Sequence, residues 1–176
     1  MMLYLLLLLS QEEGSTALQQ DSSRVDSVNI IHYSAGQITY DLERSLIILR
    51  DSSEITYQDI TLLSDSAYYY IETNNLEAFG TCDLRQMADS IRGSHLRYNI
   101  DTKKAVMSGG VTQIDKGLIT GEEIYWVDEK TINAYNGIYT TCTDTPPHYY
   151  FYAPRMKVYI GDMVITRPIV LFVEGY

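Results

Sequence analysis

Four similar seven-residue blocks recur at nearly constant spacing along this sequence of 176 residues. Each block begins with a small or polar residue and ends with an aromatic one, and a polar turn and a short apolar run follow it. The closing aromatics are Tyr40, Tyr70, Tyr98 and Trp126, which stand at nearly equal intervals. A repeat of roughly 30 residues predicts stacked β-structure, because one repeat cannot bury its own inner face without its neighbours. The stack would present a long, continuous apolar surface.

The residues around these blocks also favour strands. Strand-like patterns run from Ser27 to about Val173, and Ile38 and Tyr40 alternate around Thr39 as in a half-buried strand. Asparagine and aspartate stand at the expected turns, where their side chains can bond the backbone. Helical spacing occurs in residues 83–91, but this segment is short and lies between strand-like stretches. We therefore predict an all-β domain.

The charge balance limits the classes of partner. The chain carries 23 acidic and 13 basic residues, which gives a formal net charge of −10. Binding to nucleic acid usually requires a basic surface, so no nucleic-acid partner is expected. Negative charge also opposes adhesion to an anionic membrane surface. The 16 tyrosines favour strands and tolerate half-wet positions, because each has an apolar ring and a polar hydroxyl.

The N-terminus combines an apolar run with a polar stretch. Residues 1–10 resemble the apolar core of a secretory signal and are predicted to be a signal-peptide remnant, which implies export. A buried N-terminal strand is the alternative. The run is too short for a membrane-spanning helix, which needs about 20 apolar residues. Residues 11–26 are polar and aperiodic, so we predict a linker there.

Three passages resemble the OstA-like periplasmic domain family. Residues 124–137 show its recurring unit, in which a strand closed by an aromatic residue precedes an acidic turn, an apolar run and a glycine. Residues 139–142, followed after two prolines by the aromatic-rich residues 148–153, are similar to the passage that closes the domain in the outer-membrane member of the family. Residues 155–160 and 168–173 resemble the segment that leads from that domain into the first barrel strands.

The resemblance covers residues 28–176 and implies both an architecture and a role. It implies an open β-jelly-roll, a taco-like stack of short antiparallel strands, in residues 27–153, and a transition towards an outer-membrane β-barrel in residues 154–176. The implied role is non-enzymatic: lipopolysaccharide transport and outer-membrane assembly at the periplasmic face of the outer membrane. The implied partners are lipopolysaccharide, a periplasmic bridge protein of the same fold and an outer-membrane lipoprotein plug.

The resemblance also implies a disulfide between Cys142 and a cysteine of the barrel. From the residues alone, Cys82 and Cys142 could instead pair with each other, pair with a distant partner or remain free thiols.

On this architecture, acyl chains would lie in an apolar groove while the sugar head group stays in water. The residues expected to line the groove are Ile38, Tyr40, Ile48, Ile55, Tyr57, Leu62, Tyr70, Leu76, Leu96, Tyr98, Ile124 and Trp126. An unpaired edge strand would dock the bridge protein by strand addition, through Val28, Ile30, Ile31 and Tyr33. A register shift of one residue would move every lining residue of a strand to its other face.

The residues give little support for catalysis. His32, His95 and His148 are dispersed without metal-ligand spacing, so neither a metal site nor another cofactor is predicted. Acidic residues stand at turns, as Asp41 and Asp128 do, rather than as a glycosidase pair. The sequence has no nucleophile elbow or phosphate loop, and we predict no catalytic residue. The alternatives are a free-standing periplasmic bridge protein of the same fold, and an extracellular β-solenoid that binds or cleaves polysaccharide.

Overall fold

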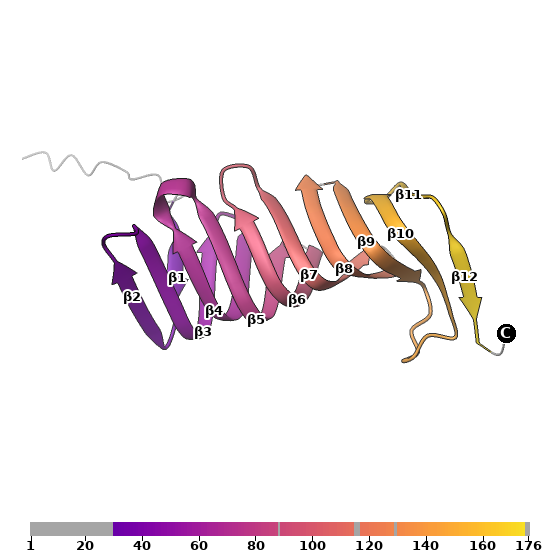
Figure 1. Ribbon diagram of the computed structural model, residues 1–176, viewed down its shortest axis with the longest axis horizontal. Helices are drawn as coiled ribbons and strands as arrows, with labels where there is room; N and C mark the ends of the chain where they lie inside the picture. The colour runs from indigo at the N-terminus through magenta and orange to yellow at the C-terminus, as the bar shows by residue number, and fades with distance from the viewer. Residues whose placement is uncertain (1–29, 88, 115–116, 129, 175–176) are drawn as a thin grey trace, which may run out of the picture.

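The computed structural model describes residues 30–87, 89–114, 117–128 and 130–174, which form one antiparallel sheet of twelve strands (Figure 1). The strands are β1 (His32–Ser34), β2 (Gln37–Asp41), β3 (Leu46–Tyr57), β4 (Ile60–Tyr70), β5 (Asn75–Gln86), β6 (Asp89–Asn99), β7 (Lys104–Ile114), β8 (Gly117–Asp128), β9 (Thr131–Thr140), β10 (Tyr149–Tyr159), β11 (Met163–Thr166) and β12 (Val170–Val173). One 3₁₀ turn, η2 (Ile71–Thr73), joins β4 to β5. The predicted signal remnant, the predicted linker and Val28 lie outside the described residues.

From β3 to β10, every strand pairs with the strands before and after it in the sequence. The predicted all-β, open stack of antiparallel strands is thus confirmed. One repeat of the sequence is a β-hairpin: β3 begins at Leu46, and β5, the first strand of the next hairpin, begins at Asn75. None of the described residues belongs to a helix with the length and apolar character needed to cross a membrane.

The segment with helical spacing is also a hairpin. Residues 83–91 span the end of β5, a turn at Met87 and the start of β6. Met87 has a φ of 52° and is 86% exposed, whereas Leu84 and Ile91 lie directly opposite each other and are buried. The apolar spacing that resembles one face of a helix therefore comes from residues on two paired strands, β5 and β6.

The long strands bend near their midpoints, so that the sheet folds over on itself. Pairing shifts register between Arg50 and Ser53 of β3, and again at the corresponding points of β4 and β5. Such bulges bend a strand and increase its twist. Gly80 and Gly109 have φ values of +87° and +59° in this zone, which a glycine adopts without steric cost. Figure 1 shows the strands side by side along the long axis, with fainter halves behind the nearer ones.

One half of the folded sheet carries a row of directly paired inner residues that crosses ten strands, here named the aromatic row. Its members, in spatial order, are Tyr40, Ile47, Tyr69, Leu76, Tyr98, Ala105, Trp126, Ile132, Val158 and Val164. The eight central members are buried, while Tyr40 and Val164 at the two ends are 53% and 40% exposed. The repeat in the sequence thus becomes one continuous apolar line in space.

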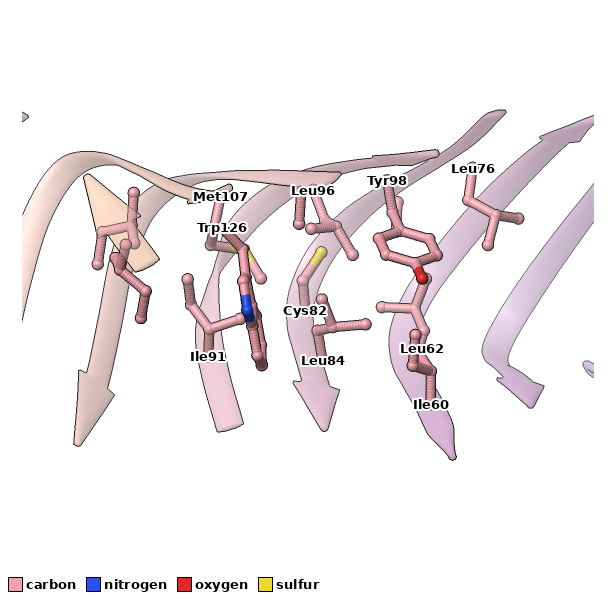
Figure 2. Close-up of a cluster of buried hydrophobic side chains, with 14 of the residues drawn as sticks. Ile60, Leu62, Leu76, Cys82, Leu84, Ile91, Leu96, Tyr98, Met107 and Trp126 are labelled. Carbon is pink, nitrogen blue, oxygen red and sulfur yellow. The ribbon is translucent and has the colours of Figure 1, made fainter. Parts of the chain in front are cut away.

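The other half carries a second row, here named the facing row. Its members are Tyr33, Ile55, Leu62, Leu84, Ile91, Thr112, Ile119, Tyr139, Phe151 and Leu171. Figure 2 shows Leu62 and Leu84 below Tyr98 and Leu96, with all four side chains directed into the space between the two halves. The core of the molecule is this space.

Candidate functional site

The space between the two halves of the sheet, here named the interior, is lined by the buried hydrophobic core residues of the described chain. Its middle is filled by the protein's own side chains. Leu49, Leu96, Met107, Ile119 and Ile124 all have 0% exposure. The groove predicted from the sequence is therefore closed in the middle of this structure, because side chains from both halves interdigitate at the close packing typical of cores.

The two ends of the interior are different. At the β2 end, Ile38 and Tyr40 are 50% and 53% exposed. At the β11 end, Val164 and Ile169 are 40% and 54% exposed, and a cavity of about 200 Å³ opens between Tyr139, Phe151, Ala153, Met156, Val164, Thr166 and Ile169. A larger hollow of about 580 Å³ is lined by outer-face residues such as Glu77 and Arg97 and also by Tyr98 of the aromatic row. The apolar interior is thus accessible at its ends.

The structure brings together ten of the twelve residues predicted to line a groove. They share the inner face and are Ile38, Tyr40, Ile55, Tyr57, Leu62, Leu76, Leu96, Tyr98, Ile124 and Trp126. Ile48 and Tyr70 lie on the outer face, because their neighbours Ile47, Leu49 and Tyr69 occupy the inner positions. These two errors show that a residue's place in the inward–outward alternation of its strand, rather than its apolar character, decides which face of the sheet it occupies.

Several inner residues were missing from the sequence-based set. They are Ile47, Leu49, Tyr69, Leu84, Ile91, Met107, Ile119, Ile132 and Val158. Their strands follow the alternation typical of half-buried sheet on each side of a bulge, but the bulge changes which positions point inward. A strictly even interval between the first three aromatics would have selected Tyr69 instead of Tyr70, because Tyr69 lies midway between Tyr40 and Tyr98.

Two tyrosines of the aromatic row differ in their hydrogen bonding. The Tyr69 hydroxyl donates to Asn74 Oδ1 at 2.8 Å, near the turn. The Tyr98 hydroxyl is buried and has no hydrogen-bond partner among the described residues. Burial, with smaller contributions from Asp59 and Tyr57, raises the pKa of Tyr98 to about 12. Within the described part of the chain, the Tyr98 hydroxyl is thus a buried polar atom of the interior without a hydrogen-bond partner, which is energetically unfavourable.

Each margin of the sheet carries two short strands. β1 and β2 both pair with β3 and with no other described strand, and β11 and β12 both pair with β10 in the same way. Of the residues predicted to dock a partner, Ile30 and Tyr33 are 40% and 41% exposed, and Ile31 packs against the core. Residues 154–173 continue the sheet, and the boundary predicted after residue 153 falls inside β10.

Both cysteines are free thiols. Cys82 lies on the inner face at the bend of β5, where burial raises its pKa to about 11. Cys142 lies in the loop between β9 and β10. The disulfide predicted for Cys142 remains a prediction.

The acidic residues at turns have structural partners. Asp41 accepts hydrogen bonds from the backbone N–H groups of Glu43 and Arg44, and Asp128 accepts one from that of Lys130. These bonds satisfy turn backbone in the way the sequence suggests.

Comparison with known proteins identifies a matching family and a similar solved structure. A family model described as OstA-like protein matches residues 25–121. Among solved structures, the chain is similar to LptH, the LptA homologous periplasmic component of the conserved lipopolysaccharide transport device from Pseudomonas aeruginosa. The alignment has a TM-score of 0.53 and 13% identity, and it covers 83% of this chain and 96% of that chain. At 13% sequence identity, the similarity shows that the two proteins share a fold and nothing further. No curated protein matches the sequence.

Proposed function

This chain belongs to the OstA-like protein family, and on that premise we propose that it binds lipopolysaccharide and passes it along the periplasm. The observation that carries the proposal is the continuous aromatic row, which is apolar along its length and exposed at both ends. Acyl chains would lie against this row while the sugar head group stays in water. Each buried CH₂ contributes about 0.8 kcal/mol, so even part of one chain would be held.

Entry of a lipid requires the interior to open. The two halves of the sheet are connected through the bends of the long strands. Opening would therefore increase the distance between the halves mainly at the margin opposite the bend. Separation would expose apolar side chains such as Leu62 and Leu96, which are 1% and 0% exposed in the closed form. An acyl chain would replace those lost contacts with equivalent ones, and this exchange makes opening in the presence of lipid much less unfavourable than opening in water.

The two margins of the sheet would dock neighbouring proteins by strand addition. Strands β1 and β2 offer one free edge and β11 and β12 the other, and the exposed end residues Tyr40 and Val164 belong to β2 and β11. An added strand would extend the aromatic row into the next molecule and keep the lipid path covered. The partners we propose are a bridge protein of the same fold and, at the outer membrane, a lipoprotein plug.

Two roles within lipopolysaccharide transport fit these features. The aromatic passage around Cys142 and the run after Pro168 resemble the outer-membrane member LptD, which would place the chain at the periplasmic face of the outer membrane and next to a barrel. The alternative is a free-standing periplasmic bridge, which the near-complete coverage of LptH favours. In both roles the chain would be exported, and residues 1–10 would belong to its signal.

Photocrosslinking tests lipid binding. A photoreactive phenylalanine at Tyr98 or Tyr40, both on the inner face, should crosslink to lipopolysaccharide. The matched controls are Arg97 and Thr39, the adjacent outer-face residues of the same strands, which should not crosslink. Tyr40 is half exposed, so substitution there leaves the packed middle intact. Equal crosslinking from inner and outer positions would refute the proposal.

A further inference from the structure

The loop between β9 and β10 brings three different metal-ligating side chains together. Cys142, Asp144 and His148 each offer one donor atom, and these atoms lie within 4.8 Å of one another. The Cys142 Sγ atom is 3.5 Å from Asp144 Oδ2 and 3.6 Å from His148 Nδ1. Asp144 Oδ2 is 2.9 Å from His148 Nδ1. The three donors therefore form a small triangle of sulfur, oxygen and nitrogen.

We propose that Cys142, Asp144 and His148 form a binding site for a zinc-class divalent cation. Ideal tetrahedral Zn²⁺, with bonds of about 2.3 Å to sulfur and about 2.0 Å to nitrogen and oxygen, separates sulfur from a lighter donor by about 3.5 Å and nitrogen from oxygen by about 3.3 Å. The two sulfur distances agree with these values, and the nitrogen–oxygen pair needs to open by a few tenths of an ångström.

The second nitrogen of the histidine ring supports the same assignment. His148 Nε2 lies 3.4 Å from Oε2 of Glu174, the residue that follows β12. Histidines that bind metals usually donate their other N–H to a carboxylate, which fixes the tautomer and directs the free lone pair at the cation. Glu174 lies close enough to Nε2 to take this role, and Nδ1 is the ring nitrogen near Cys142 and Asp144.

Backbone contacts hold the loop in this shape. The N–H of Cys142 donates to Thr140 Oγ1 at 3.0 Å, and the Thr140 hydroxyl donates to the carbonyl of Tyr149 at 2.6 Å. The N–H of Glu174 donates to the carbonyl of His148 at 2.7 Å. These hydrogen bonds hold the loop at its start, at its end and to Glu174, the residue after β12. Figure 1 shows the loop beside the end of β12. A fixed loop reduces the entropy lost on binding a cation.

The donor set indicates the kind of cation. A thiolate with an imidazole and one carboxylate suits Zn²⁺ and related ions, whereas Mg²⁺ and Ca²⁺ prefer oxygen ligands alone. Three protein ligands leave a fourth position for water or for a donor from another molecule. The cation would fasten the β9–β10 loop to the strand at the C-terminal margin of the sheet.

This site is difficult to recognise from the sequence alone. Its ligands follow a C-x-D-x₃-H pattern with one residue of each type, whereas common zinc-binding motifs contain pairs of cysteines or histidines at fixed spacing.

Cobalt binding to the reduced, metal-free chain tests the proposal. Co²⁺ should bind at one equivalent and produce thiolate-to-cobalt charge-transfer absorption in the near ultraviolet, together with the intense visible bands of a tetrahedral site. Zn²⁺ should displace it. Cys142→Ser, Asp144→Asn and His148→Gln should each weaken binding at least about 10-fold, and Glu174→Gln by about 10-fold to 100-fold. His32→Gln, in an exposed histidine of β1, is the matched control and should leave binding unchanged.

A second measurement uses the unaltered chain. Zn²⁺ should protect Cys142 from alkylation by iodoacetamide, as mass spectrometry of the modified peptides would show, while the buried Cys82 stays unmodified with or without the metal. Absence of saturable cobalt binding, absence of the charge-transfer band, or equal alkylation of Cys142 with and without Zn²⁺ would overturn the proposal.

Discussion

Tyr69 and Tyr98 flank Leu76 in the aromatic row, one sequence repeat apart, yet only Tyr69 has a hydrogen-bond partner for its hydroxyl among the described residues. This difference gives the first prediction. Removing the unsatisfied hydroxyl with Tyr98→Phe should raise the free energy of unfolding by about 1 kcal/mol, whereas Tyr69→Phe should lower it by about 1 kcal/mol because a hydrogen bond is lost. Urea unfolding of both variants checks this. A destabilised Tyr98→Phe variant would mean that its hydroxyl is bonded in solution.

The bend in β5 leads to the second prediction. Gly80 has a φ of +87°, and a Cβ atom at this position would overlap Asp65 Oδ2 and lie 2.7 Å from Asp65 Cβ. Gly80→Ala should therefore lower the free energy of unfolding by about 2 kcal/mol. Gly161→Ala is the matched control, since Gly161 has a φ of +76° but an added Cβ atom would meet nothing within 4 Å. It should cost about 1 kcal/mol. Thermal or urea unfolding measures both, and equal losses would show that Asp65 moves aside freely.

The repeat in the sequence predicted the stack but not which residues of each strand face inward. Residues 68–70 are three consecutive tyrosines, and alternation allows either Tyr69 alone or its two neighbours to point inward. The bulge between Leu63 and Ser66 decides in favour of Tyr69, and a bulge is set by pairing with the next strand rather than by local sequence. The misassignment of Tyr70 has this cause.

The closed middle of the interior could not be predicted either. A groove and a core use the same apolar residues, and the difference depends on how near the two halves of the sheet approach. Leu62 and Leu96 belong to different halves and become buried only when the sheet folds over. Similarly, Cys142 and His148 meet only through the path of a loop, which propensities do not specify.

The third prediction concerns pH. On the outer face, the Asp83 carboxylate of β5 contacts Arg85 at 2.7 Å and Arg92 of β6 at 3.2 Å, while its β4 partner is the apolar Leu63. Burial opposes ionisation of Asp83, but the hydrogen bonds and charges of the two arginines outweigh it and hold the pKa below its ordinary value of 3.8.

Protonation therefore favours the unfolded chain, in which the Asp83 carboxyl accepts a proton more readily. Its contribution to stability should be complete above about pH 5 and lost as the pH falls through the lowered pKa. Asp83→Asn should cost about 1 kcal/mol at pH 7, and the gap from the parent protein should shrink towards zero near pH 2. Denaturant unfolding of both proteins across this range measures the gap. A gap that does not change with pH would show that the arginines do not stabilise the ionised form.

The fourth prediction tests the exposed end of the interior. Because the proposed partner has the same fold, a second copy of this chain is a suitable probe of edge docking. Ile38 is 50% exposed on the inner face of β2, and lysine there would place a charge where an apolar contact is expected. Ile38→Lys should weaken self-association at least about 10-fold in sedimentation or light-scattering titrations, since burying an unpaired charge is unfavourable.

Thr39→Lys adds the same charge to the same strand but on its outer face, and should leave association unchanged. The pair separates two explanations for any loss of binding. If association depended on backbone pairing or net charge alone, both variants would behave alike, because they share the edge and the charge. A selective effect at Ile38 requires that the inner faces of the two copies meet, and that contact is what would carry an acyl chain from one molecule to the next without exposure to water.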